Sequence, residues 1–174
     1  MSVLRCFGPN TLRSSASTSS PSLSASFQLG EEVLALDRKV FGPKHPDTLQ
    51  AMCNLAISYS ADGRQDEALK LGEEVLTLDR KVFGPEHPDT LMAMGNLALS
   101  YSDSGRWDAA LKLGEEVLAL DRKVFGPEHP DTIEAMGTLA ISYRAKGEVA
   151  KAEALEKEIA AAKAKAKAPP PASK

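Results

Sequence analysis

FGPEHPDT occupies residues 83–90 and returns unchanged at 125–132, and FGPKHPDT stands at 41–48. The copies are 42 residues apart, and aligning the chain with itself at this offset makes residues 29–70 and 71–112 identical at 33 of 42 positions. A period of this length is typical of tandem arrays built from one supersecondary unit. The octapeptide therefore predicts a joint that occurs once per unit.

Each unit is expected to contain two helices. In the first unit, apolar residues recur every three or four positions over 49–59 and again over 68–82, which is the pattern of one helix face. Gly63 lies between the two runs, where a turn would separate the helices. We therefore predict helix pairs over three spans, with a cap helix closing the last, and these spans are 46–83, 88–125 and 130–162.

The joint contains the residues that end one helix and begin the next. Gly84 can adopt the left-handed conformation that terminates a helix, and Pro88 suits the first turn of the following one. Asp89 adds negative charge at that N-terminus, and its side chain or that of Thr90 is expected to cap the free N–H groups.

Three histidines, His45, His87 and His129, stand in the joints and suggest either a shared ligand or a structural role. Translation by one repeat should place them roughly 10 Å or more apart. Metal ligands must lie within about 2–2.5 Å of one ion. We therefore predict a structural role for the histidines, and neither a metal nor a cofactor.

The composition excludes several classes of partner. Residues 31–156 carry 14 basic and 23 acidic side chains, a net charge of −9, which would repel phosphate backbones and argues against nucleic-acid binding. No apolar run approaches the roughly 18–20 residues of a membrane helix. Cys6 and Cys53 lack the spacing of a disulfide framework or a zinc site, so a reducing, cytoplasmic location is expected.

The ends of the chain depart from the repeat. Residues 1–22 are rich in Ser, with two Arg and no acid, and are interpreted as a disordered leader, the alternative being a transit peptide. FGPNTL at 7–12 resembles a shortened joint, which suggests an eroded repeat whose second helix survives at 23–41. At the other end, a Lys/Ala/Pro tail is expected over 163–174.

The orphan helix at 23–41 should lack a partner on one side. That side includes some of Phe27, Leu29, Val33 and Leu36, which we expect to be exposed or bound. It is therefore a candidate surface for homo-oligomer formation. Alternatively, the chain is a fragment of a longer array.

Three stretches carry a family resemblance: NLAISYSADGRQDEA at 54–68, NLALSYSDSGRWDAA at 96–110 and TLAISYRAKGEVAKA at 138–152. They resemble the tetratricopeptide pattern N-L-G/A-x-x-Y-x-x-x-G-x-x-x-x-A, here in a longer form similar to the repeats of kinesin light chains. The resemblance implies an all-α solenoid, a right-handed superhelix of about three helix pairs plus the orphan helix. It places small residues at the closest helix contacts, namely Ala56, Ala98, Ala140, Ala68, Ala110 and Ala152.

The resemblance also implies a concave, peptide-binding groove lined by the first helix of each pair. Residues at this face vary between otherwise near-identical copies, although random drift at exposed positions would give the same pattern. Asn54 and Asn96 occupy the position whose amide can clamp a peptide backbone, and Thr138 replaces them in the third copy. The alternative is an asparagine that bonds only within its own helix. The full predicted set is Gln50, Cys53, Asn54, Ile57, Met92, Gly95, Asn96, Leu99, Asp103, Glu134, Thr138, Ile141 and Arg144.

These features predict a non-catalytic scaffold that binds a protein or peptide. Arg144 is almost alone as a basic residue in the predicted set, so a basic or apolar ligand is expected rather than an acidic one. No phosphate-binding loop or catalytic triad is found, so we predict that the protein is not an enzyme. The alternatives are a self-assembling array and a fragment of a larger signalling or kinesin light chain-like protein.

Overall fold

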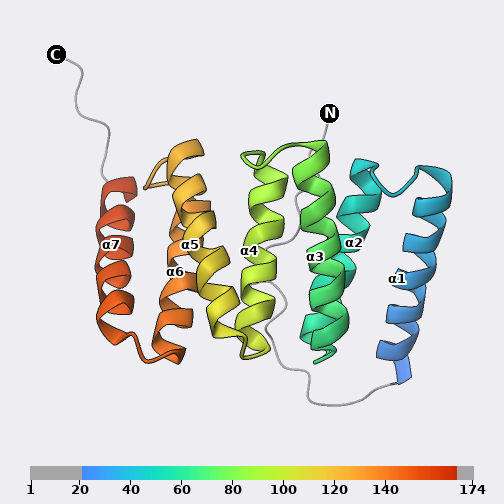
Figure 1. Cartoon of the computed structure of the whole chain (residues 1–174), viewed down its shortest axis with the longest axis horizontal. Coiled ribbons are helices and arrows are strands. Elements are labelled where there is room, and N and C mark those ends of the chain that lie inside the picture. Colours follow the sequence, from blue (N-terminus) through green and yellow to red (C-terminus); the bar gives the residue numbers. More distant parts are fainter. Residues whose placement is uncertain (1–20, 168–174) are drawn as a thin grey trace.

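The computed structural model describes residues 21–167, with side chains described from 27 to 165. Within this range there are seven helices and no strand, and the helices stand side by side in a row (Figure 1). Their bounds are α1 Pro21–Val40, α2 Pro46–Ala61, α3 Gln65–Val82, α4 Pro88–Asp103, α5 Trp107–Val124, α6 Pro130–Ala145 and α7 Val149–Lys167.

The predicted all-α solenoid is confirmed. The most extensive contacts join α2 with α3, α4 with α5, and α6 with α7, so these helices form three pairs. The first helices α2, α4 and α6 also contact one another in order, while α1 packs mainly on α2. α1 begins inside the segment predicted as a leader (1–22), the rest of which lies outside the described residues, as does the tail after Lys167.

Each joint uses its histidine as the helix cap. The His87 ring accepts a hydrogen bond through Nδ1 from the backbone N–H of Asp89 at 3.2 Å and stacks on Phe83, with ring centroids 4.7 Å apart. His45 and His129 do the same in their joints. The expectation that Asp or Thr is the cap was therefore wrong: Pro88 occupies the first helical turn, so the residue before it holds the capping position.

The glycine of each joint ends the preceding helix. Gly42, Gly84 and Gly126 have φ of 88°, 91° and 90°, the left-handed region that side chains with a Cβ rarely adopt. The turn reverses the chain within a few residues. The next helix therefore returns alongside the one before it.

Small and flexible residues fill the contacts between helices. The six alanines expected at close approaches are all buried, with at most 8% of their surface exposed. Met52, Met94 and Met136 are completely buried, at 0% exposure, one in each first helix. Gly72 lies so close to α4 that an added Cβ would stand 3.1 Å from Leu97 Cδ1, so a side chain here would force Leu97 to shift.

Polar contacts connect successive repeats along the second helices. Arg80 of α3 reaches Glu116 of α5 at 2.6 Å, and its guanidinium also lies 3.7 Å from the Met94 sulfur of α4. Arg38 and Arg122 make the equivalent contacts one repeat earlier and later. The hydroxyl of Tyr101 on α4 donates to Glu73 of α3 at 2.7 Å. These bonds connect each repeat to the next in the same way along the array.

Candidate peptide-binding groove

The residues predicted to contact a peptide all lie on α2, α4 and α6. Because these three helices contact one another in order, they form one continuous layer, with the second helices α3, α5 and α7 in the other (Figure 1). The predicted residues therefore lie in one layer, although they come from three helices that are 42 residues apart in the sequence.

An aliphatic side chain recurs at one position in each first helix. Ile57 and Leu99 are half-buried, and Ile141 is 58% exposed. Gly95 and Gly137 lie one turn before Leu99 and Ile141, and a Cβ added to either glycine would meet no atom within 4 Å. The layer therefore combines partly or fully exposed aliphatic side chains with open space beside the helix backbone.

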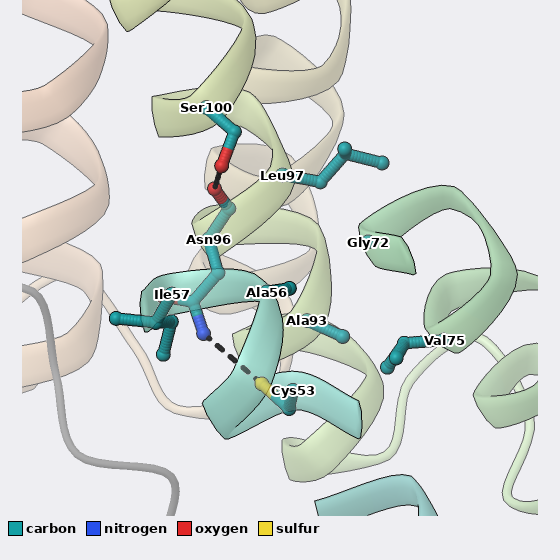
Figure 2. Close-up of a pocket in the computed structure, with 9 residues that line it drawn as sticks. All are labelled: Cys53, Ala56, Ile57, Gly72, Val75, Ala93, Asn96, Leu97 and Ser100. Atoms are coloured by element: carbon teal, nitrogen blue, oxygen red, sulfur yellow. Dashed lines mark hydrogen bonds between the residues drawn. The ribbon is translucent and has the colours of Figure 1, made fainter. Parts of the chain in front are cut away.

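Figure 2 shows the residues of α2, α3 and α4 that line a small, partly open pocket next to this surface. Its volume is about 20 Å³, and Cys53, Ile57 and Asn96 of the predicted set contribute to its lining. This is space for roughly one water molecule, far below the several hundred Å³ typical of a small-molecule site. Recognition at this layer would have to occur along the surface rather than in a closed pocket.

The two asparagines differ in their surroundings. Asn54 is exposed, and its Oδ1 accepts a hydrogen bond from Gln50 Nε2 at 3.1 Å. Asn96 is half-buried, and its Nδ2 donates to the Cys53 sulfur at 3.5 Å across the α2–α4 contact (Figure 2). A bond to a thiol sulfur is weak, so the Asn96 amide can be redirected toward a ligand at little cost.

A serine one turn after each asparagine was not predicted. The Ser58 hydroxyl donates to the backbone carbonyl of Asn54 at 2.9 Å, and the Ser100 hydroxyl donates to the backbone carbonyl of Asn96 at 3.0 Å. Ser142 repeats this bond with Thr138. The recurring spacing of four residues is a sequence signal that could have identified these serines.

Charge on the predicted set is mainly acidic. Arg144 forms a two-pronged ion pair with Glu156 of α7, at 2.9 and 2.7 Å, so its guanidinium already has an anionic partner. Desolvation, and secondarily the charge of Asp131, raises the pKa of the exposed Glu134 carboxyl. Asp103 is exposed at the end of α4. The charges on the layer therefore favour a cationic ligand over an anionic one.

Metal binding and membrane insertion find no support in the described residues. Across residues 21–167, no three His, Cys, Asp or Glu side chains are placed to share a metal ion. Among the helices α1 to α7, none has both the length and the apolarity required to cross a bilayer.

Comparison with known proteins identifies the class. The family model described as the tetratricopeptide repeat matches residues 24–81, 66–123 and 89–165. The chain therefore belongs to the tetratricopeptide repeat family, whose members generally mediate protein–protein interactions on a scaffold that is typically non-catalytic. No curated protein sequence matches it.

Among solved structures, the chain resembles repeats of the kinesin light chain type. A Podosopora anserina protein described as a kinesin light chain with nearly identical TPR-like repeats is 31% identical, with a TM-score of 0.74 over 84% of this chain and 70% of that one. A variant of that protein, in which one glutamine is replaced by methionine, gives 32% identity and a TM-score of 0.75, over 83% and 68%. BtubC (BKLC) from P. vanneervenii, at 18% identity, shares the fold with a TM-score of 0.78 over 88% of this chain and 61% of that one. The chain is thus a kinesin light chain-like repeat protein.

Proposed function

We propose that this chain is a non-catalytic module that binds an extended peptide segment of a partner protein across α2, α4 and α6. The observation that carries the proposal is the repeated pairing of an amide with an aliphatic side chain one turn later: Asn54 with Ile57, and Asn96 with Leu99. An amide can donate to and accept from a peptide backbone, while the aliphatic residue takes up an apolar side chain. The repeat places such pairs in successive helices, which suits a ligand that runs across the layer.

The preferred ligand is apolar or basic. Glu134 supplies an exposed carboxylate, and Ile141 supplies exposed aliphatic surface. Arg144, the one basic member of the predicted set, is held by Glu156, which disfavours an acidic ligand. For a short segment we expect a dissociation constant in the micromolar range, about −8 kcal/mol.

The absence of catalysis and a cytoplasmic location are parts of the same proposal. The cavity beside the layer holds about 20 Å³, too little to enclose a substrate. Cys53 is a buried cysteine outside any disulfide in the part of the chain that the structure describes, which suits a reducing compartment.

A peptide display screen followed by titration tests the proposal. Peptides selected on the native chain should lose about tenfold or more in affinity when Asn54→Ala and Asn96→Ala are combined, because both amides would leave the layer. Thr77→Ala, at an exposed position of α3 in the other layer, is the matched control and should leave affinity unchanged. Undiminished binding by the double variant would reject the amide clamp. Selected peptides that are consistently acidic would reject the ligand class.

A second candidate function, assembly of the chain with itself, is favoured by the exposed aliphatic residues of α1. It is compatible with peptide binding because α1 carries none of the predicted groove residues.

A further inference from the structure

α1 is equivalent to the second helix of a pair, but it exposes a face that the second helices α3 and α5 bury. In α3, the face carrying Leu71 and Val75 packs on α2, and these side chains are only 9% and 2% exposed. One repeat earlier, the equivalent Leu29 and Val33 of α1 are 61% and 45% exposed. Among the described residues no first helix precedes α1, so this face has no partner.

The exposed residues of α1 form a continuous stripe. Leu36 and Val40, at 59% and 62% exposure, follow Leu29 and Val33 at spacings of three and four residues, on one side of the helix. We call these four residues the α1 stripe. It spans about three turns, or roughly 16 Å. Contiguous apolar surface of this kind marks an interaction site.

The opposite end of the array does not complement the α1 stripe. On α7, Glu156 stands where α3 and α5 have Gly72 and Gly114, the glycines that admit the next first helix. Ala164 stands where α3 and α5 carry the arginines that reach the next repeat. The end formed by α7 has therefore lost the features by which one repeat accepts another, and head-to-tail stacking of copies is not supported.

The chain's own leader is poorly suited to cover the stripe. Aligned on the joint, residues 11–20 correspond to the start of a first helix, yet Ser15 and Thr18 stand where α2 has the buried Met52 and Leu55. A Ser-rich segment cannot supply the apolar face that buries Leu71 and Val75 in the interior pairs.

We propose that the α1 stripe is the contact surface of a two-fold homodimer in which the two α1 helices run antiparallel. Glu32 and Lys39 lie seven residues apart along one edge of the stripe, and both are exposed. Antiparallel pairing about the middle of the stripe sets Glu32 beside the partner's Lys39, and the two-fold axis repeats the pair. Parallel two-fold pairing would instead set this edge against the opposite edge of the partner's stripe, so the Glu32–Lys39 pairs could not form. The two-fold arrangement also closes on itself, so assembly ends at two copies.

The repeats give independent support for a cation at Glu32. Its equivalents Glu74 and Glu116 each receive an arginine from the preceding second helix, at 2.8 and 2.6 Å. Glu32 makes no ion pair within the described residues, because no second helix precedes α1 there. The partner's Lys39 would supply the missing charge. This inference is independent of peptide binding, since it uses only α1.

Light scattering on the full chain during size-exclusion chromatography tests the dimer. At tens of micromolar, the native chain should have about twice its 18.6 kDa mass. Val33→Glu should be monomeric, with the dimer weakened at least a hundredfold, and should keep its helical circular dichroism. Val149→Glu, a matched change at a 46% exposed valine of α7, should remain dimeric.

A charge exchange tests the antiparallel arrangement. Glu32→Lys alone and Lys39→Glu alone should each weaken the dimer about tenfold, because each places two like-charged pairs at the contact. Combining the two substitutions restores both pairs only if the helices are antiparallel, so the double variant should dimerise like the native chain. Failure of the double variant to recover would overturn the arrangement.

A native chain that is monomeric at these concentrations would overturn the dimer itself. If that monomer dimerised after Leu12→Ser, the leader would be identified as the occupant of the stripe. Selected peptides should bind Val33→Glu as they bind the native chain, so failure of the dimer and failure of the groove can be told apart.

Discussion

The first joint, at 41–48, and the second, at 83–90, share seven of eight residues but not their surroundings. Their glycines have nearly the same φ, 88° and 91°, and both histidines cap the following helix. In the second joint the Thr90 hydroxyl donates to the Gly84 carbonyl at 2.8 Å, whereas the Thr48 hydroxyl is buried without a partner among the described residues. The octapeptide therefore specifies the same turn in both joints, but not the partner of its buried threonine hydroxyl.

Asp79 precedes the second joint, and its replacement should give the largest effect. Burial, together with the charge of Asp89, raises the pKa of Asp79 to about 6. The folded protein then binds a proton that the unfolded chain binds only below about pH 4. The free energy of unfolding should therefore fall as pH rises from about 4 to about 6, and stay lower above that range.

Asp79→Asn should remove this penalty and raise the free energy of unfolding at pH 7 by about 1–3 kcal/mol. Urea denaturation of the variant and the native chain at several pH values measures the difference, which should shrink toward pH 4. Asp37→Asn, the equivalent change in the half-buried position of α1, should give a smaller gain at pH 7. A gain that is the same at every pH would contradict the assignment.

Thr90→Val and Thr48→Val should change the free energy of unfolding by different amounts in the two joints. Losing the hydroxyl of Thr90 leaves the partly buried Gly84 carbonyl without this donor and should cost about 1–2 kcal/mol. The same change at Thr48 removes a buried, unsatisfied hydroxyl and should be neutral or slightly stabilising. Chemical denaturation of both variants checks this, and equal costs would show that the joints are energetically equivalent.

The smallest expected difference is between the amide hydrogen-exchange rates of α1 and α4. In the monomeric Val33→Glu variant, amides of α1 should exchange faster than those of α4, because α1 packs mainly on α2 whereas α4 contacts helices on both sides. In the native chain, protection of α1 should rise with protein concentration if the α1 stripe is covered by a second copy. Protection that is independent of concentration would count against that contact.

The period of 42 residues was enough to predict the helix pairs, since apolar spacing and joint residues repeat together. It also indicated the unpartnered face of α1. The capping role of the histidines was missed, although Pro at the first helical position implied that the residue before it is the cap. The Arg144–Glu156 pair and the Asn96–Cys53 bond were beyond reach, because they join different helices through side-chain rotamers that no local pattern specifies.

The bonds between repeats connect residues at constant separations: 14 from Arg80 to Met94, 28 from Glu73 to Tyr101, and 36 from Arg80 to Glu116. An in-frame duplication of one 42-residue unit would recreate every one of these bonds at the new boundary without any further mutation. Such a gene can lengthen or shorten by recombination while each product remains foldable, and selection can then act on the length of the array rather than on its stability.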